Sequence, residues 1–200
     1  MQNDNVLRNM PADTKFFVYQ EATLAYSPET GMCWRVDKRD GNWNLIIPGA
    51  SNGKYTQLGV GTNVLQLHRI IAEVFLNSGK PLTAQQKVDH IKHADGSHYQ
   101  DRLENLRICS NSENIRNCRL SSRNTSGYKG VCWNKPTSKW RARIRISGKL
   151  LHLGFFHTPE DAAEAYDAAA IRYFGEFSLT NAKLGNFKPR KPSLGLMQVF

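Results

Sequence analysis

The sequence Trp-Arg-Ala-Arg-Ile-Arg-Ile fills residues 140–146 and alternates strictly between two kinds of side chain. Neighbouring side chains of a β-strand point to opposite faces, so this alternation predicts a strand with one apolar and one basic face. The basic face carries Arg141, Arg143 and Arg145, spaced roughly 6.6 Å apart, which is close to two base-pair rises of duplex DNA at ~3.4 Å each. A sheet bearing such a row can lie in the major groove, where arginine bonds guanine bidentately. The alternative is a strand face that only meets solvent.

The flanking residues complete a small module of three strands and one helix. Tyr128–Trp133 is expected to form the first strand, and Leu150–Phe156 the third, after a turn at Ser147-Gly148-Lys149. Thr158 is a predicted helix N-cap, and Gly175 is predicted to end that helix. The helix face expected to cover the apolar side of the sheet consists of Ala162, Ala165, Tyr166, Ala169 and Tyr173. Two residues of the first strand are expected to extend the basic surface, Lys129 and Trp133.

A second constellation of polar residues lies upstream, in three short motifs. These are Val88-Asp89-His90-Ile91, Glu104-Asn105-Leu106-Arg107 and Ser110-Asn111-Ser112-Glu113-Asn114. Their order predicts a strand over 87–91, a polar loop over 92–102, a returning strand over 103–109 and a helix, whose first turn is stabilised by a capping box of Ser110 and Glu113.

The chemistry of these motifs points to phosphodiester hydrolysis. Asp89 and the amide oxygen of Asn114 are suitable ligands for one Mg²⁺ or Mn²⁺ ion, which would neutralise phosphate charge. The imidazole of His90, with an unperturbed pKa near ~6.5, is suited to deprotonating a water. Asn105 is expected to pin the loop or orient the imidazole. The alternative is that Asp89 and His90 form a satisfied polar pair, with both asparagines serving as turn and cap.

The net charge of +10 is unevenly distributed along the chain. Residues 1–118 contain 13 Lys/Arg and 12 Asp/Glu, whereas residues 119–200 contain 14 and 5. This asymmetry indicates a polyanion-binding module joined to a nearly neutral one. The expected division is a domain over 1–118 with its core at about 60–118, a basic linker over 119–127, a DNA-binding domain over 128–182, and a basic tail over 183–200.

Within the first domain, short strands are predicted at 16–19, 32–36, 44–47 and 55–58, with turns such as 51–53, followed by a helix over 64–76 that contains His68. The fold class is therefore α+β. No apolar run is long enough for a membrane span and no signal peptide is evident, so a cytoplasmic protein is expected. The four cysteines form no C-x-x-C pair, so reduced thiols and no structural zinc are expected.

The V-D-H-I, E-N-L-R and S-E-N motifs resemble the HNH (ββα-metal) nucleases, above all the phage and intron-encoded homing endonucleases. The resemblance covers about residues 60–118. It implies a ββα-metal core with His90 as general base, Asp89 and Asn114 as ligands of Mg²⁺ or Mn²⁺, and Asn105 as the structural middle residue.

The second module resembles the plant Apetala-two/ethylene-response-factor DNA-binding domain over residues 128–182. The matching residues include Tyr128-Lys129-Gly130-Val131, Leu153-Gly154-x-Phe156 and Thr158-Pro159-Glu160-Asp161-Ala162-Ala163. The resemblance implies base or phosphate contacts at Lys129, Arg143, Arg145 and His152. Several plant base-reading positions are not basic in this chain, so the plant target sequence is not carried over.

Together these patterns predict a site-specific, metal-dependent endodeoxyribonuclease of homing type, acting as a monomer on duplex DNA in the cytosol of a bacterium or a phage-infected host. Two alternatives remain. One is a DNA-binding regulator with a decayed HNH core that does not cut, and the other is a degradative nuclease that tolerates many sequences.

Overall fold

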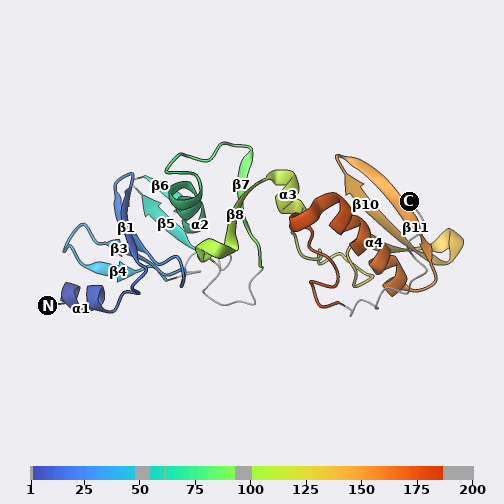
Figure 1. Cartoon of the computed structure of the whole chain (residues 1–200), viewed down its shortest axis with the longest axis horizontal. Helices are drawn as coiled ribbons and strands as arrows, with labels where there is room; N and C mark the ends of the chain where they lie inside the picture. Colours follow the sequence, from blue (N-terminus) through green and yellow to red (C-terminus); the bar gives the residue numbers. More distant parts are fainter. Residues whose placement is uncertain (1, 48–54, 61, 93–100, 187–200) are drawn as a thin grey trace. The chain divides into compact units, whose positions relative to one another are not determined.

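The computed structural model describes residues 2–47, 55–60, 62–92 and 101–186. The chain forms two compact units, residues 1–111 and residues 112–200, which are described separately below. Both units mix helices with antiparallel sheets, as expected for the α+β class (Figure 1). No helix within the described ranges is long and apolar enough to cross a membrane.

The first unit opens with helix α1 (Gln2–Arg8) and a four-stranded antiparallel sheet in the order β1-β2-β3-β4. The strands are β1 (Lys15–Tyr19), β2 (Ala22–Tyr26), β3 (Cys33–Val36) and β4 (Trp43–Leu45). Strand β2 was not predicted, because four of its five residues are buried and it lacks the polar alternation that marks a half-buried strand.

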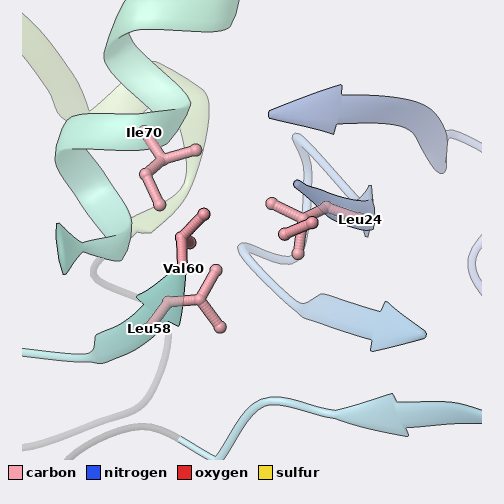
Figure 2. Close-up of a cluster of buried hydrophobic side chains, with 5 residues drawn as sticks. Leu24, Leu58, Val60 and Ile70 are labelled. Atoms are coloured by element: carbon pink, nitrogen blue, oxygen red, sulfur yellow. The ribbon is translucent and has the colours of Figure 1, made fainter. Parts of the chain in front are cut away.

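A hairpin of β5 (Gln57–Val60) and β6 (Asn63–Gln66) follows, and the chain then enters α2 (Leu67–Ile71) and a π-helical turn η1 (Ala72–Leu76). The predicted helix over 64–76 thus begins three residues late, because 64–66 pair with β5. Leu24, Leu58, Val60 and Ile70 form the hydrophobic cluster that joins this hairpin and helix to the sheet (Figure 2).

Strands β7 (Gln86–His90) and β8 (Leu106–Ser110) form an antiparallel pair, and a 3₁₀ turn η3 (Leu103–Asn105) precedes β8. The predicted strands at 87–91 and 103–109 therefore exist with shifted ends. The connecting residues 93–100 lie outside the described residues, as does the predicted turn at 51–53. Helix α3 (Asn111–Arg116) follows β8, and from Ser112 onward it belongs to the second unit.

The second unit contains a three-stranded antiparallel sheet in the order β11-β10-β9. Its elements are β9 (Val131–Asn134), η4 (Lys135–Thr137), β10 (Lys139–Ile146), β11 (Lys149–Phe156), α4 (Pro159–Phe174) and η5 (Gly175–Phe177). The Thr158 hydroxyl accepts the Asp161 backbone N–H at 3.2 Å, which is the predicted N-cap. Gly175, at φ 55°, follows the helix as predicted.

Helix α4 packs on the apolar face of this sheet through small residues. Ala162, Ala163 and Ala170 are almost completely buried, together with Ala142 of β10. Tyr173, expected on the packed face, is 45% exposed, while its neighbour Phe174 is buried instead. The predicted linker over 119–127 lies within this unit, and the predicted tail is described only to residue 186.

The lack of a side chain at Gly130 allows the ring of Tyr166 on α4 to approach the backbone just before β9. Gly130 has φ +78°, and a Cβ placed there would lie 1.9 Å from the ring of Tyr166. The residues after α4 are held by buried polar groups: Asp167 accepts the N–H groups of Asn181 and Ala182, at 2.8 Å and 2.9 Å. The Asn181 amide in turn bonds the backbone of Lys129, so the segment before β9, α4 and the C-terminal segment form one assembly.

Candidate nucleic-acid interface

Asp89 is a buried partner of Arg107 in the first unit. The two residues are directly opposite each other in the β7–β8 register. The Oδ2 atom of Asp89 accepts from Nε and Nη2 of Arg107 at 2.9 Å and 2.7 Å, and the two side chains are 2% and 13% exposed. The carboxylate charge is therefore balanced inside the fold by a guanidinium from the neighbouring strand.

His90 leaves the opposite face of β7, as strand alternation predicts. Its Nε2 lies 2.8 Å from Oδ1 of Asp101, and its ring is 5.2 Å from the ring of His68, centroid to centroid. The ring of Tyr55 lies 6.2 Å away in a stacked orientation. His90 is thus buried among polar and aromatic side chains, on the side of the strand away from Asp89.

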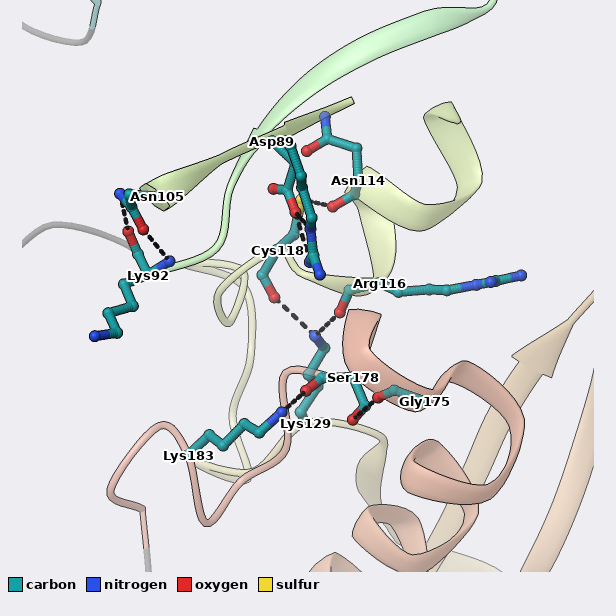
Figure 3. A network of polar contacts seen from close by, with 11 residues as sticks. Asp89, Lys92, Asn105, Asn114, Arg116, Cys118, Lys129, Gly175, Ser178 and Lys183 are labelled. Carbon is teal, nitrogen blue, oxygen red and sulfur yellow. Dashed lines mark hydrogen bonds and ion pairs between the residues drawn. The ribbon is translucent and has the colours of Figure 1, made fainter. Parts of the chain in front are cut away.

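Asn105 fastens the start of the segment after β7 to the turn before β8. Its Oδ1 accepts the Lys92 backbone N–H at 2.8 Å, and its Nδ2 donates to the Lys92 carbonyl at 3.2 Å (Figure 3). Asn114 lies on α3 in the second unit, where its backbone carbonyl accepts from the Cys118 thiol at 3.5 Å. The predicted metal ligands Asp89 and Asn114 therefore belong to different units of the chain.

Strand β10 shows the predicted alternation between its two faces. Ala142 and Ile144 are 0% and 2% exposed against α4, whereas Arg143 and Arg145 point to solvent from the other side. On the neighbouring strand β11, Leu150 and His152 are exposed as well. The row of guanidinium groups is therefore accessible to a ligand.

The outer face also has a shaped surface beside the arginines. A hollow of about 240 Å³ is lined by Arg141, Arg143, Leu150, His152 and Phe155. Arg143 and His152 are cross-strand neighbours, and a bulge between Ala142 and Arg143 interrupts the register. The rings of His152 and Phe155 are 4.6 Å apart, so cationic, imidazole and aromatic groups meet in one shallow depression.

The guanidinium groups on this face are partly positioned by the protein. Nη2 of Arg141 lies 3.5 Å from the Cys132 sulfur, and Nη1 of Arg145 donates to the Gly148 carbonyl at 2.9 Å. Each guanidinium carries several N–H donors, so one internal bond leaves others for an external acceptor. Such anchoring lowers the side-chain entropy that binding would cost.

Two residues predicted on this surface lie elsewhere. Trp133 pairs with Trp140 across the strands, at 5.1 Å between rings, so it lies on the sheet face that α4 covers. Lys129 Nζ donates to the carbonyls of Arg116 and Cys118 at 2.6 Å and 2.8 Å, at the C-terminal end of α3 (Figure 3). Burial lowers the pKa of Lys129 to about 8. Alternation along the first strand would have placed Trp133 on the same face as Val131, away from the arginines, whereas the bonds of Lys129 could not be read from sequence.

Comparison with known proteins identifies the second unit. Residues 126–176 match the AP2 domain family. This segment is an AP2 DNA-binding domain. The resemblance predicted over 128–182 is therefore confirmed, with the match beginning two residues earlier and ending six residues earlier. The sheet with its outward arginines and its covering helix α4 is the fold of this AP2 domain.

Curated relatives share sequence with less than half of the chain. One is the AP2-like ethylene-responsive transcription factor CRL5 of Oryza sativa subsp. japonica, 43% identical over 89 residues, or 42% of this chain and 14% of the relative. The AP2-like ethylene-responsive transcription factor AIL5 of Arabidopsis thaliana is 38% identical over 46% of this chain and 17% of its own length. The ethylene-responsive transcription factor WRI1 of Arabidopsis thaliana is 36% identical over 49% of this chain and 24% of its own length.

These relatives contradict the predicted phage-type HNH endonuclease. The proteins that share the AP2 domain are named transcription factors, so the hydrolase assignment and the metal binding inferred from it are wrong. In the structure the Asp89 carboxylate is buried and paired with Arg107. Spacing alone does not reveal whether a carboxylate has an ionic partner, so this pairing could not be predicted from the Asp89-His90 motif.

Sequence reasoning did not find the cluster around His90. His68 and Asp101 lie with His90, which is 22 residues after His68 and 11 residues before Asp101 along the chain. Only the turn of α2 and the path of the chain before η3 bring the three side chains together. The sequence signal for it was His68 itself, which stands among the apolar residues Leu67, Ile70 and Ile71 of α2.

Proposed function

We propose that this protein is a sequence-specific, duplex-DNA-binding regulator that contacts DNA with the outer face of β10 and β11. The observation that carries the proposal is the pair of exposed arginines, Arg143 and Arg145, on the outer sheet face of an AP2 domain. The relatives' names describe transcription factors, and this chain spans only 14–24% of the length of those three, so regulation by the whole protein rests on the shared domain.

The roles we assign follow from position on the sheet. Arg143 and Arg145 are the exposed arginines of β10 and are assigned to base edges or phosphates, with Arg141 and His152 completing the surface beside them. Arginine bonds guanine O6 and N7 bidentately, which supplies sequence selectivity, whereas phosphate contacts supply affinity that depends on salt. The excess positive charge of residues 119–200 favours the encounter with DNA.

Fluorescence anisotropy with a duplex selected in vitro by the full chain tests this assignment. The double variant Arg143→Ala/Arg145→Ala should bind at least about tenfold more weakly, because each bidentate arginine–guanine pair contributes about 1–3 kcal/mol. The slope of log Kd against log salt should fall by about 1 for each arginine–phosphate bond that the substitutions remove. Arg172→Ala, which removes an exposed arginine from α4 rather than from the sheet, is the matched control.

Two outcomes would contradict the proposal. Equal affinity of the double variant and the Arg172→Ala control would place the DNA contact outside the sheet. The selected duplex is expected to remain uncut when incubated with the protein and Mg²⁺. Cut products that disappear on addition of EDTA would show that the protein is an enzyme after all.

A further inference from the structure

Three metal-ligating side chains of the first unit converge on one buried point. One ring nitrogen each of His68 and His90, and one carboxylate oxygen of Asp101, all lie within 4.8 Å of one another. The three residues are 5%, 8% and 9% exposed. They come from three separate places in the fold: the first turn of α2, the end of β7 and the segment just before η3.

The backbone around these side chains is held independently of any ligand. The Tyr26 hydroxyl donates to the backbone carbonyl of Asp101 at 2.7 Å. Gly31 packs closely against the peptide bond between Asp101 and Arg102, since a Cβ added to it would lie 3.0 Å from the Arg102 nitrogen. His90 is fixed by its pairing with Leu106 of β8, and the ring of Tyr55 lies 5.0 Å from that of His68. Ligands whose supports are already rigid need little reorganisation to bind.

The polar atoms of this cluster are not fully satisfied by the protein. Nδ1 of His68 is buried and has no hydrogen-bond partner among the residues that the structure describes. The Asp101 carboxylate, whose side chain is 13% exposed, has its Oδ1 atom 2.8 Å from Nε2 of His90. Buried charges are normally neutralised by a partner or by a metal ion. Burial lowers the pKa of His68 to about 4, so its imidazole is neutral at neutral pH and has a lone pair to donate.

We propose that His68, His90 and Asp101 form a binding site for one divalent first-row transition metal ion, with Zn²⁺ the best fit. Two imidazoles and a carboxylate suit zinc and its neighbours, whereas Mg²⁺ prefers oxygen ligands alone. A tetrahedral zinc ion holds its donors roughly 3.3 Å apart, so the side chains would close by up to about 1.5 Å. Such an ion would tie α2, β7 and the segment before η3 together.

This site differs from the magnesium site predicted from sequence in its residues, its ligand atoms and its metal. It shares only His90 with the earlier set of polar motifs, and it involves neither Asp89 nor Asn114. It also stands apart from the proposed DNA contact, which lies on the other unit, so either proposal can fail without the other.

A cobalt titration of the full chain, first stripped with EDTA, tests the site directly. The expected result is one Co²⁺ per chain, with the intense visible absorption bands of a tetrahedral ion. Zn²⁺ should abolish these bands and a large excess of Mg²⁺ should leave them unchanged. A spectrum that remains that of hexaaquo cobalt, or binding that does not saturate at one equivalent, would overturn the proposal.

Substitutions locate the ion. His68→Gln and Asp101→Asn should each remove the bands and weaken Co²⁺ binding by at least about 100-fold, since even changes to groups that only support ligands cost 10–100-fold. His157→Gln removes an exposed histidine of the second unit and should leave binding unchanged. Unaltered binding by folded His68→Gln and Asp101→Asn proteins would overturn the assignment.

X-ray absorption spectroscopy of the unmodified, zinc-loaded chain decides the question if either variant fails to fold by circular dichroism. Two imidazole nitrogens and at least one oxygen at about 2.0–2.2 Å would support the site. A sulfur shell at about 2.3 Å, or oxygen ligands alone, would overturn it.

Discussion

The β7–β8 pair and the β10–β11 pair present ionisable residues in the same way along an antiparallel register, yet they differ in what those residues can do. In the first, Asp89 faces Arg107, the charges are opposite, and the side chains of Asp89 and Arg107 are only 2% and 13% exposed. In the second, Arg143 faces His152 and both are exposed to solvent. A buried and paired charge is already neutralised within the fold, whereas unbalanced and exposed positive charge is available to an external anion.

This difference explains why the exposed arginines of β10 were predicted from sequence and the ion pair between β7 and β8 was not. A regular alternation such as that of residues 140–146 fixes which side chains share a face, and the apolar residues fix which face is buried. No comparable pattern shows that a carboxylate and a guanidinium 18 residues apart will neutralise each other.

The largest effect is expected from breaking the close contact beneath the sheet of the AP2 domain. Gly130→Ala should lower the unfolding free energy of the second unit by about 4 kcal/mol or more, because it combines a left-handed backbone with a clash against the Tyr166 ring. Gly148→Ala, at φ +81° with open space around it, should cost only about 1–2 kcal/mol. Urea denaturation of each variant, followed by a signal from the second unit, measures both changes in unfolding free energy. Equal destabilisation by the two substitutions would show that the ring contact is not limiting.

The next largest effect tests whether Asp89 is structural. Asp89→Ala should destabilise the first unit by about 3 kcal/mol, because it leaves the guanidinium of Arg107, whose side chain is only 13% exposed, without this carboxylate. Replacing both residues by leucine should recover much of that stability. Asp37→Ala, which breaks an exposed pair with Arg39, should leave thermal stability nearly unchanged.

DNA affinity sharpens the same test, because Asp89→Ala should not alter it in protein that remains folded. A decrease in DNA affinity at constant stability would instead make Asp89 part of the interface. Anisotropy with the selected duplex, at a temperature well below the melting transition of the variant, separates the two explanations.

A smaller effect concerns Lys129, whose ammonium lies on carbonyls at the end of α3 rather than on the DNA-facing surface. Its folded pKa of about 8 is below its unfolded value, so between the two the unfolded chain binds more protons and stability rises with pH. The gain from pH 8 to pH 10 should be about 2 kcal/mol, taking an unfolded value near 10.4. Urea denaturation of the wild type and of Lys129→Met, compared over this range, isolates the contribution. An equal rise in both would exclude Lys129 as its source.

Much of the second unit was predictable from sequence. Strict alternation over 140–146, the turn at 147–149, and the Thr158 cap and Gly175 end of α4 are local signals, and the structure follows each of them. The first unit was less predictable. The buried strand β2 has no alternation, and the register that joins β6 to β5 overrides the helical spacing of 64–66.

The candidate sites divide in the same way. The face on which Arg143 and Arg145 lie follows from the period of two residues in a strand. The internal bonds of Lys129, the pairing of Asp89 and the grouping of His68 with Asp101 depend on contacts between distant segments. Such contacts are set by packing of the whole unit, and no local pattern reports them.

The most direct test of the difference between the two strand pairs is an amide NMR titration of the isotope-labelled full chain with its selected duplex. DNA contact through the outer face of the AP2 domain predicts the largest chemical-shift changes in β10 and β11, with the amides of β7 and β8 unmoved. Changes centred on Asp89, His90 and Arg107, with β10 and β11 unaffected, would contradict the account.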